Sequence, residues 1–199
     1  MSNPKHIHLV AAKHVLRYVR RIITYGLRYT PSSGVLLSRY SDSDWAGSAV
    51  DRKSTSGYCF SMGSAMISWS SRKQGSIAQS TAEAKYIAAS DACKEAVWLR
   101  ELLSDIFEGK LNSTIIHCDN PSCIQLLENL VFHDRSKHIE MRYHFIRDLV
   151  QRGAPKLQYI HMDEQIADIL TKPLIASKFV YFLDKLGMVE NASLVEREC

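Results

Sequence analysis

Hydrophobic and polar positions alternate with two different periods along this chain, and each period predicts its own kind of element. From His6 to about Tyr25, apolar residues recur every three or four positions, which is the spacing of one helix face. Lys and Arg occupy the remaining positions, so this helix is either a solvated surface element or a basic helix that lies along nucleic acid. A break rich in Pro, Ser and Gly at residues 30–34 ends the segment.

Short β-branched and aromatic runs follow the break and predict three strands. The first covers residues 34–39, and the others are Tyr58–Met62 and Ala65–Ser70. Only Gly63 and Ser64 separate the last two, which is typical of a two-residue hairpin. We therefore expect these three strands to form an antiparallel meander.

A long helix and a parallel crossover are predicted next. The helix runs from about residue 81 to 107, with Ser80 at its N-cap position and Glu83 placed to complete a capping box. Residues 114–119 form a β-branched run that predicts a fourth strand, and Asn120 begins another helix that reaches about residue 129. A helix in this position favours a parallel connection between strands.

The last part of the chain predicts two more helices and one more strand. Residues 137–152 form a helix rich in Lys, Arg and His, and Lys156–His161 alternates as a fifth strand. Asp163 can cap a short helix that carries Asp168. Ser177–Leu186 is amphipathic and predicts a final helix, after which the chain is expected to fray.

Composition is that of a globular protein and does not fix a partner. The 199 residues are 46% hydrophobic, enough to bury one substantial core. A net charge of +4 and a pI near 8.8 are compatible with a polyanionic partner but do not demand one. Five cysteines, an odd number without a paired framework, favour a reducing compartment. Because no apolar run reaches the length of a membrane span, we expect a soluble intracellular protein without a membrane partner.

Four acidic side chains stand where predicted strands end or predicted helices begin. They are Asp42, Glu83, Asp119 and Asp168. If they converge, their repulsion raises one or more pKa values unless cations neutralise them, and oxygen ligands of this kind suit Mg²⁺ or Mn²⁺. Each acid also has a simpler interpretation. Glu83 can complete the capping box, and Asp42 or Asp44 can terminate a strand. Asp119 can accept backbone bonds beside the next helix, and Asp168 can be a surface acid. Their order along a βββαβα chain favours a metal-dependent nuclease.

Six motifs follow one another between residues 34 and 186. They are Tyr40-Ser41-Asp42-Ser43-Asp44-Trp45-Ala46-Gly47, Arg52-Lys53-Ser54-Thr55-Ser56-Gly57-Tyr58, Gln79-Ser80-Thr81-Ala82-Glu83-Ala84, Cys118-Asp119-Asn120, Lys137-His138-Ile139 through Arg142-Tyr143-His144-Phe145-Ile146-Arg147, and Ala167-Asp168-Ile169-Leu170-Thr171-Lys172-Pro173-Leu174. As a set they resemble the ribonuclease H domain of Ty1/copia-type retrotransposon Pol polyproteins. The preceding helix resembles the segment that joins that domain to the reverse transcriptase.

The resemblance implies a ribonuclease H-like α/β fold, with a mixed five-stranded sheet (three strands antiparallel and two parallel) flanked by helices. It implies two Mg²⁺ ions, or Mn²⁺ in their place, and cleavage of the RNA strand of RNA–DNA hybrids during reverse transcription. The matching catalytic and metal-binding carboxylates are Asp42, Glu83, Asp119 and Asp168. Asp44 is the alternative for the first position, and His161 is the histidine nearest the last acid, in a short loop.

The resemblance also implies a domain division and partners. We expect a basic helix and linker at residues 1–33, a ribonuclease H-like domain at 34–186 and a flexible tail at 187–199. The basic side chains expected to hold phosphates are Arg72, Lys73, Lys137, Arg142 and Arg147. The expected partners are an RNA–DNA hybrid and the reverse transcriptase portion of the same polyprotein. The expected location is the cytoplasm, where the family forms virus-like particles, or the nucleus.

Two other functions stay open on the sequence alone. A degenerate domain could grip hybrids without cutting them. An integrase or transposase shares the sheet but uses an Asp-Asp-Glu order, whereas Glu83 precedes Asp119 here and no His/Cys zinc segment precedes the core. The polymerase signature Tyr-x-Asp-Asp is absent, so we do not expect a working reverse transcriptase. A start within the linking segment indicates a fragment of a longer polyprotein.

Overall fold

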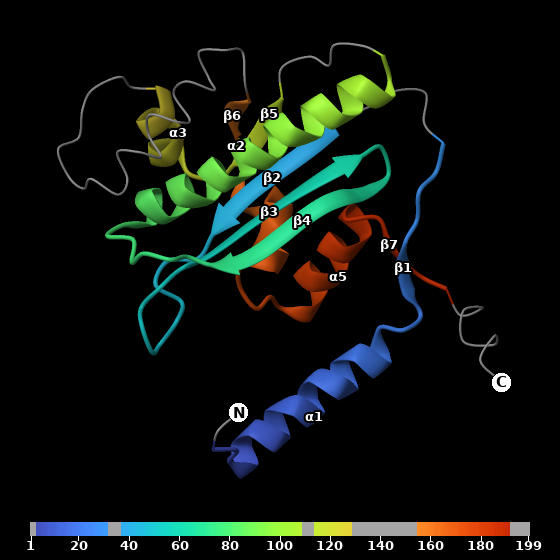
Figure 1. Cartoon of the computed structure of the whole chain (residues 1–199), viewed down its shortest axis with the longest axis vertical. Coiled ribbons are helices and arrows are strands. Elements are labelled where there is room, and N and C mark those ends of the chain that lie inside the picture. Colours follow the sequence, from blue (N-terminus) through green and yellow to red (C-terminus); the bar gives the residue numbers. More distant parts are fainter. Residues whose placement is uncertain (1–2, 32–36, 109–113, 129–154, 192–199) are drawn as a thin grey trace.

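A mixed five-stranded sheet lies at the centre of the domain, in the strand order β4-β3-β2-β5-β6 (Figure 1). The computed structural model describes residues 3–31, 37–108, 114–128 and 155–191. The strands are β2 (Leu37–Ser43), β3 (Thr55–Met62), β4 (Ala65–Lys73), β5 (Ile115–Cys118) and β6 (Lys156–Tyr159). The first three form an antiparallel meander, and β5 is parallel to both β2 and β6. The predicted mixed sheet is therefore confirmed.

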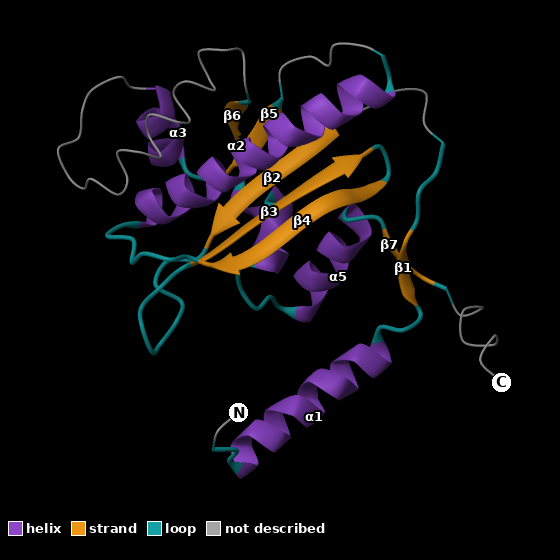
Figure 2. Cartoon of the chain, viewed as in Figure 1, coloured by secondary structure: helices purple, strands orange, loops and turns teal. Residues whose placement is uncertain are grey.

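Helices cover both faces of this sheet (Figure 2). One face carries α2 (Thr81–Ile106) and α3 (Pro121–Glu128). The other carries the 3-10 helix η2 (Ile166–Leu170) and α5 (Ala176–Lys185), and a shorter 3-10 helix, η1 (Met162–Glu164), precedes η2. The predicted long helix and final helix are thus confirmed, whereas the short helix around Asp168 is a 3-10 helix.

Two buried apolar clusters hold these layers together. Phe60 packs with Tyr86 of α2 and Ile116 of β5 on one face. The residue before it on β3, Cys59, packs with Phe182 of α5 on the other face. This division follows from the strand geometry, because successive side chains of a strand point to opposite faces of the sheet. The central strands are therefore fixed on both sides, which gives the side chains at their ends a rigid support.

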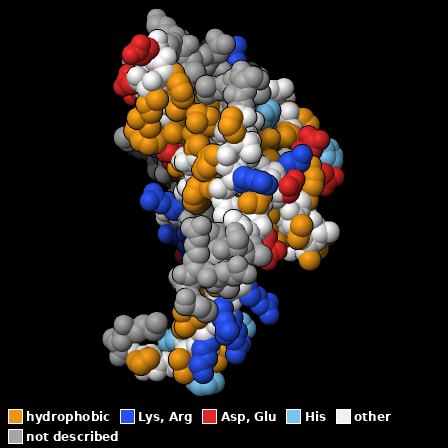
Figure 3. Space-filling model, turned by 90° about the vertical axis from the view of Figure 1, so that its right-hand side faces the viewer, with side chains coloured by type: hydrophobic (Ala, Val, Ile, Leu, Met, Phe, Trp, Pro, Cys, Tyr) orange, Lys and Arg blue, Asp and Glu red, His pale blue; other side chains and the backbone are white. Residues whose placement is uncertain are grey.

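The N-terminal helix α1 (His6–Arg21) lies apart from the layered domain (Figure 1). It confirms the predicted amphipathic helix, but none of its residues is buried. Lys and Arg side chains gather at this end of the molecule (Figure 3). The helix is connected to the domain through β1 (Tyr25–Leu27), which pairs antiparallel with β7 (Met188–Glu190).

Strand β7 lies within residues 187–199, which were predicted to be a flexible tail. It pairs with β1, which lies near the other end of the chain. The predicted helix at residues 137–152 lies outside the described residues. Within the described ranges, no helix combines the length and the apolar character that crossing a bilayer requires.

Candidate functional site

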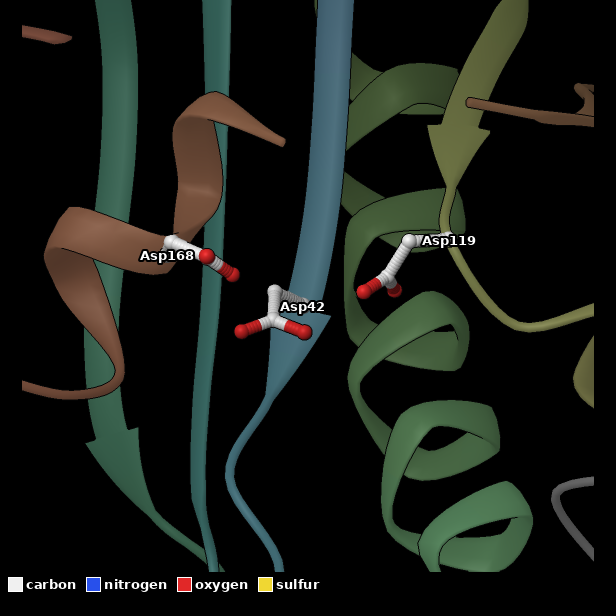
Figure 4. Close-up of side chains that lie close together, drawn as sticks. All are labelled: Asp42, Asp119 and Asp168. Carbon is white, nitrogen blue, oxygen red and sulfur yellow. The ribbon is translucent and has the colours of Figure 1, made fainter. Parts of the chain in front are cut away.

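Three aspartates from three separate elements meet at one edge of the sheet. Asp42 lies near the end of β2, Asp119 directly follows β5, and Asp168 lies in η2. Since β2 and β5 are parallel neighbours, their carboxyl ends reach the same edge. The three carboxylates point toward one another (Figure 4), and each offers an oxygen within 4.8 Å of the other two. We refer to Asp42, Asp119 and Asp168 as the aspartate trio.

Glu83 does not belong to the group of carboxylates that the structure brings together. Its backbone N–H donates to Ser80 Oγ at 3.2 Å, and its Oε2 accepts a hydrogen bond from the backbone N–H of Gln79 at 2.9 Å. Ser80 therefore caps α2 as predicted, but the Glu83 carboxylate bonds the residue before the N-cap and not Ser80 itself, so only half of the predicted capping box forms. Of the four predicted acids, the structure brings Asp42, Asp119 and Asp168 together.

Lys85 is the residue of α2 whose side chain contacts the trio. Its Nζ donates to Asp42 Oδ1 at 2.5 Å and to Asp119 Oδ1 at 2.5 Å. Two residues along an α-helix correspond to a rotation of about 200°, so residues 83 and 85 face in nearly opposite directions. The Lys85 side chain is 13% exposed and that of Asp42 is 0% exposed, so both charges lie mostly out of water.

Lys85 was not among the residues predicted from the sequence, although a signal for it existed. The residues three, four and seven positions after it are all alanines, Ala88, Ala89 and Ala92, and all are buried. Positions with this spacing share one face of a helix. A lysine at the start of an alanine face that packs on the sheet needs an acidic partner, because a buried charge is otherwise costly. This requirement points to the acids at the neighbouring strand ends.

Further polar groups surround the other side of the trio. Lys172 Nζ lies 2.8 Å from Asp168 Oδ1 and 3.9 Å from Asp42 Oδ2. Lys178 Nζ lies 3.5 Å from Asp168 Oδ2. The Thr171 hydroxyl donates to Asp42 Oδ2 at 2.6 Å. The two oxygens of Asp42 thus have different partners, an ammonium on one and a hydroxyl with a second ammonium on the other.

The charges of the trio are balanced by the chain itself. Among the described residues, the lysines that contact it are Lys85, Lys172 and Lys178, equal in number to the aspartates. Lys178 is shared with the exposed Asp163, whose Oδ1 lies 3.6 Å from its Nζ. The formal charge of the trio and its lysines is therefore zero.

Burial and charge shift the pKa values at the site in opposite directions. Burial disfavours the charged form of Lys85, but its attraction to Asp42 and its hydrogen bonds to Asp119 and Asp42 outweigh burial and raise its pKa. Burial also acts to raise the pKa of Asp42, but the charge and hydrogen bond of Lys85 outweigh it, so this pKa is lowered. The pKa of Asp168 is raised by burial and by the nearby charge of Asp42. Lys85 and Asp42 are therefore both charged at neutral pH.

Buried amides hold the elements of the site in register. Gln74 Nε2 donates to Ser43 Oγ at 3.2 Å, to Ser56 Oγ at 2.8 Å and to the carbonyl oxygen of Ala84 at 2.9 Å. This one side chain therefore ties the ends of β2 and β3 to the first turn of α2. Gln165 Nε2 donates to the carbonyl oxygen of Ser41 at 3.1 Å, which fixes η2 beside β2.

The remaining predicted residues lie in different settings. Asp44, the alternative first ligand, accepts a hydrogen bond from the Thr55 backbone N–H. His161 is exposed, and its Nδ1 accepts a hydrogen bond from the Asp163 backbone N–H at 3.3 Å. Arg72 is exposed near the end of β4, and the neighbouring Lys73 forms an ion pair with Asp51 at 2.8 Å. The other basic residues predicted to hold phosphates lie outside the described residues. They are Lys137, Arg142 and Arg147.

The trio has the donor chemistry for a metal ion, but its present arrangement does not fit one between Asp42 and Asp119. Three carboxylates this close can hold a cation, and Mg²⁺ prefers such oxygen ligands. The ammonium of Lys85, however, contacts the Oδ1 atoms of Asp42 and Asp119, which are two of the oxygens that would hold such an ion. Two cations at one pair of oxygens repel each other. The lysines thus provide the counter-charge that a metal ion would otherwise provide.

Comparison with known proteins gives the family. No family model matches the chain. It is 39% identical over 188 residues to the retrovirus-related Pol polyprotein from transposon RE1 of Arabidopsis thaliana. This match covers 94% of the present chain and 13% of that protein. It is 38% identical over 191 residues to the retrovirus-related Pol polyprotein from transposon TNT 1-94 of Nicotiana tabacum. This second match covers 96% of the present chain and 14% of that protein. The chain thus spans only a small part of these relatives.

A solved structure gives the fold type. The structure of LC11-RNase H1 in complex with an RNA/DNA hybrid superimposes with a TM-score of 0.51 at 12% sequence identity, over 68% of this chain and 94% of that one. The predicted ribonuclease H-like fold is therefore confirmed, although an identity this low carries no activity with it. Together, the sequence relatives and the fold identify the chain as a member of the retrovirus-related Pol polyproteins of copia-type transposons, with a ribonuclease H-like fold.

Proposed function

We propose that this chain binds RNA–DNA hybrids as the ribonuclease H-type domain of a copia-type Pol polyprotein, and that it holds the RNA strand without cutting it. The observation that carries this proposal is the ammonium of Lys85, which lies 2.5 Å from both Asp42 and Asp119. The fold likeness supports the choice of nucleic acid, because LC11-RNase H1 has been solved with an RNA/DNA hybrid.

Charge balance at the trio supports binding without a metal ion. Three unpaired carboxylates would repel a phosphate backbone. Lys85, Lys172 and Lys178 cancel that charge, so a phosphate can approach this edge of the sheet without a divalent cation between them. The face that carries the trio is therefore suited to contact with a polyanion in its metal-free form.

Hydrolysis of the RNA strand with Mg²⁺ or Mn²⁺ is the second candidate function. It is favoured by the convergence of three carboxylates from three elements. Water would add across a phosphodiester bond of the RNA and leave a 3′-hydroxyl and a 5′-phosphate. Lys85 opposes this candidate, because its ammonium contacts Oδ1 of both Asp42 and Asp119 and places a positive charge where an ion held by these carboxylates would lie. We therefore place binding first.

Basic side chains away from the trio would position the hybrid. Arg72 and Lys73 are exposed near the end of β4, and we keep Lys137, Arg142 and Arg147 as candidates. Each phosphate contact contributes about one unit to the slope of the logarithm of the binding constant against the logarithm of the salt concentration. Within the polyprotein, we expect the reverse transcriptase portion to hold the same hybrid and to add to this affinity.

Fluorescence anisotropy with a short labelled hybrid tests the proposal. We expect the wild-type chain to bind the hybrid more tightly than duplex DNA of the same sequence, with an affinity in EDTA no weaker than in Mg²⁺ and with the RNA left at full length. The double variant Arg72→Ala/Lys73→Ala should lower the salt dependence by about two units. Equal affinity for both nucleic acids would reject hybrid recognition, and RNA shortening in Mg²⁺ would establish the second candidate instead.

A further inference from the structure

The position of the Lys85 ammonium coincides with the bridging point between two carboxylates. It contacts one oxygen of Asp42 and one of Asp119, while the second oxygen of Asp42 is held by the Thr171 hydroxyl. Asp42 is fully buried, so it has no access to water that could replace this partner. A single cation at this point satisfies both carboxylates, and in this chain that cation is part of the polypeptide.

The formal charges explain why a second cation would not enter. The trio and its three lysines sum to zero, so a divalent ion added to this arrangement would leave an excess of two positive charges in a mostly buried place. Replacing Lys85 by Glu leaves four carboxylates against two lysines. The resulting deficit of two charges is the amount that one divalent cation cancels.

Side-chain length is compatible with this exchange. A Glu side chain is shorter than a Lys side chain, so a carboxylate at residue 85 would stop short of the position that Nζ takes in the wild type. The gap that remains lies between three carboxylates, those of residue 85, Asp42 and Asp119, which are hard oxygen donors for Mg²⁺ or Mn²⁺. The change would therefore supply a further ligand and the space for an ion together.

We propose that Lys85 is the resident cation of the aspartate trio, and that the residue at position 85 decides whether this site excludes or binds a divalent metal ion. The metal preference of the site does not depend on the proposed function. Only its consequence, hybrid binding without cleavage, rests on that function. Exclusion of the ion keeps the domain in a state that binds hybrids without cleaving them. The metal specificity of the site is then a property of one side chain on α2.

Titration with Mn²⁺ alone tests this directly, with the free ion followed by electron paramagnetic resonance. We expect Lys85→Glu to bind Mn²⁺ at least about tenfold more tightly than the wild type, since even outer partners of metal ligands alter affinity by about 10–100-fold. Lys85→Met removes the ammonium without adding a ligand, so its affinity for Mn²⁺ should lie between those of Lys85→Glu and the wild type. Lys94→Glu makes the same charge change as Lys85→Glu at an exposed position of α2, and its affinity for Mn²⁺ should equal that of the wild type.

A second readout keeps the inference separate from the proposed function. The melting temperature of Lys85→Glu should rise on addition of Mg²⁺ or Mn²⁺, whereas the melting temperature of the wild type should not change. Wild-type affinity for Mn²⁺ equal to that of Lys85→Glu would overturn the inference, as would the absence of Mn²⁺ binding by both folded Lys85 variants. Loss of hybrid binding by the wild type in EDTA would reject the proposed function and leave the metal result standing.

Discussion

Replacing Lys85 by Met removes the main counter-charge of a buried aspartate while keeping most of the side-chain volume. In the wild type, the Lys85 side chain is 13% exposed and Asp42 is 0% exposed, with 2.5 Å between Nζ and Oδ1. The variant leaves Asp42 charged in the same surroundings. We therefore expect the free energy of unfolding at neutral pH, in EDTA, to fall.

The structure sets the size of this effect. Removing one partner of a buried ion pair costs about 3–5 kcal/mol, because an uncompensated charge stays behind. Asp42 keeps the Thr171 hydroxyl at 2.6 Å and Lys172 at 3.9 Å, so we expect the lower end, about 3 kcal/mol. For a chain of 199 residues this corresponds to a fall in melting temperature of about 6–12 °C. The variant should still fold, since a domain of this size is stable by about 5–15 kcal/mol.

The effect should depend on pH in a defined direction. Because the folded-state pKa of Asp42 is lowered, the stability it contributes is present above its unfolded pKa of about 3.9 and is lost as the pH falls through the folded value. The difference between the wild type and Lys85→Met should therefore be largest near neutral pH. It should shrink as the pH falls below about 4, because the unfolded chain then binds a proton at Asp42 that the folded wild type binds only at a lower pH.

Urea unfolding followed by circular dichroism measures these differences. Lys94→Met is the matched control, because Lys94 pairs with Asp91 at 3.2 Å where both side chains are partly exposed, and its loss should cost less than about 0.5 kcal/mol. A double-mutant cycle with Asp42→Asn should give a coupling energy of about 2 kcal/mol between residues 42 and 85. A Lys85→Met variant as stable as the wild type at pH 7 in EDTA, with no coupling between residues 42 and 85, would show that Lys85 does not stabilise the buried Asp42.

Two further substitutions test how the site is supported. A Cβ at Gly57 would lie 2.7 Å from Thr171 Cγ2 and 2.8 Å from Leu170 Cβ, so Gly57→Ala should displace η2 and cost about 1–3 kcal/mol in urea unfolding. Gly75→Ala, with no atom within 4 Å, is its control, and equal stability of the two variants would contradict the close contact. Gln74→Leu removes three buried hydrogen bonds that join β2, β3 and α2, and it should cost about 2 kcal/mol by the same measurement. An unchanged midpoint would show that this amide does not hold the elements together.

Local signals were sufficient for most of the sheet. The two-residue connection at Gly63 and Ser64 predicted the β3–β4 hairpin, and the structure shows Gly63 at φ 65°, a conformation that glycine adopts readily. The β-branched run before Asp119 predicted β5, and the helix after it predicted the parallel arrangement. Strand ends therefore led to Asp42 and Asp119, although β2 (Leu37–Ser43) extends past the strand predicted at residues 34–39 and itself contains Asp42.

Features that depend on distant packing were not predictable in this way. Which residue of the first turn of α2 faces the trio depends on how the helix is rotated against the sheet, so Glu83 was chosen where Lys85 makes the contact. Strands β1 and β7 are three residues each and pair across almost the whole chain, so neither carries a periodic signal of its own. Asp168 was predicted from its sequence motif, but its ion pair with Lys172, four residues later, was not predicted.

A crystal structure of the wild-type chain grown in Mn²⁺, with data collected at the manganese absorption edge, would locate both the Lys85 nitrogen and any bound ion. We expect the Lys85 nitrogen between Asp42 and Asp119, with no anomalous peak at the carboxylates of the trio. An anomalous peak bound to Asp42 and Asp119, with Lys85 turned away from both, would contradict it.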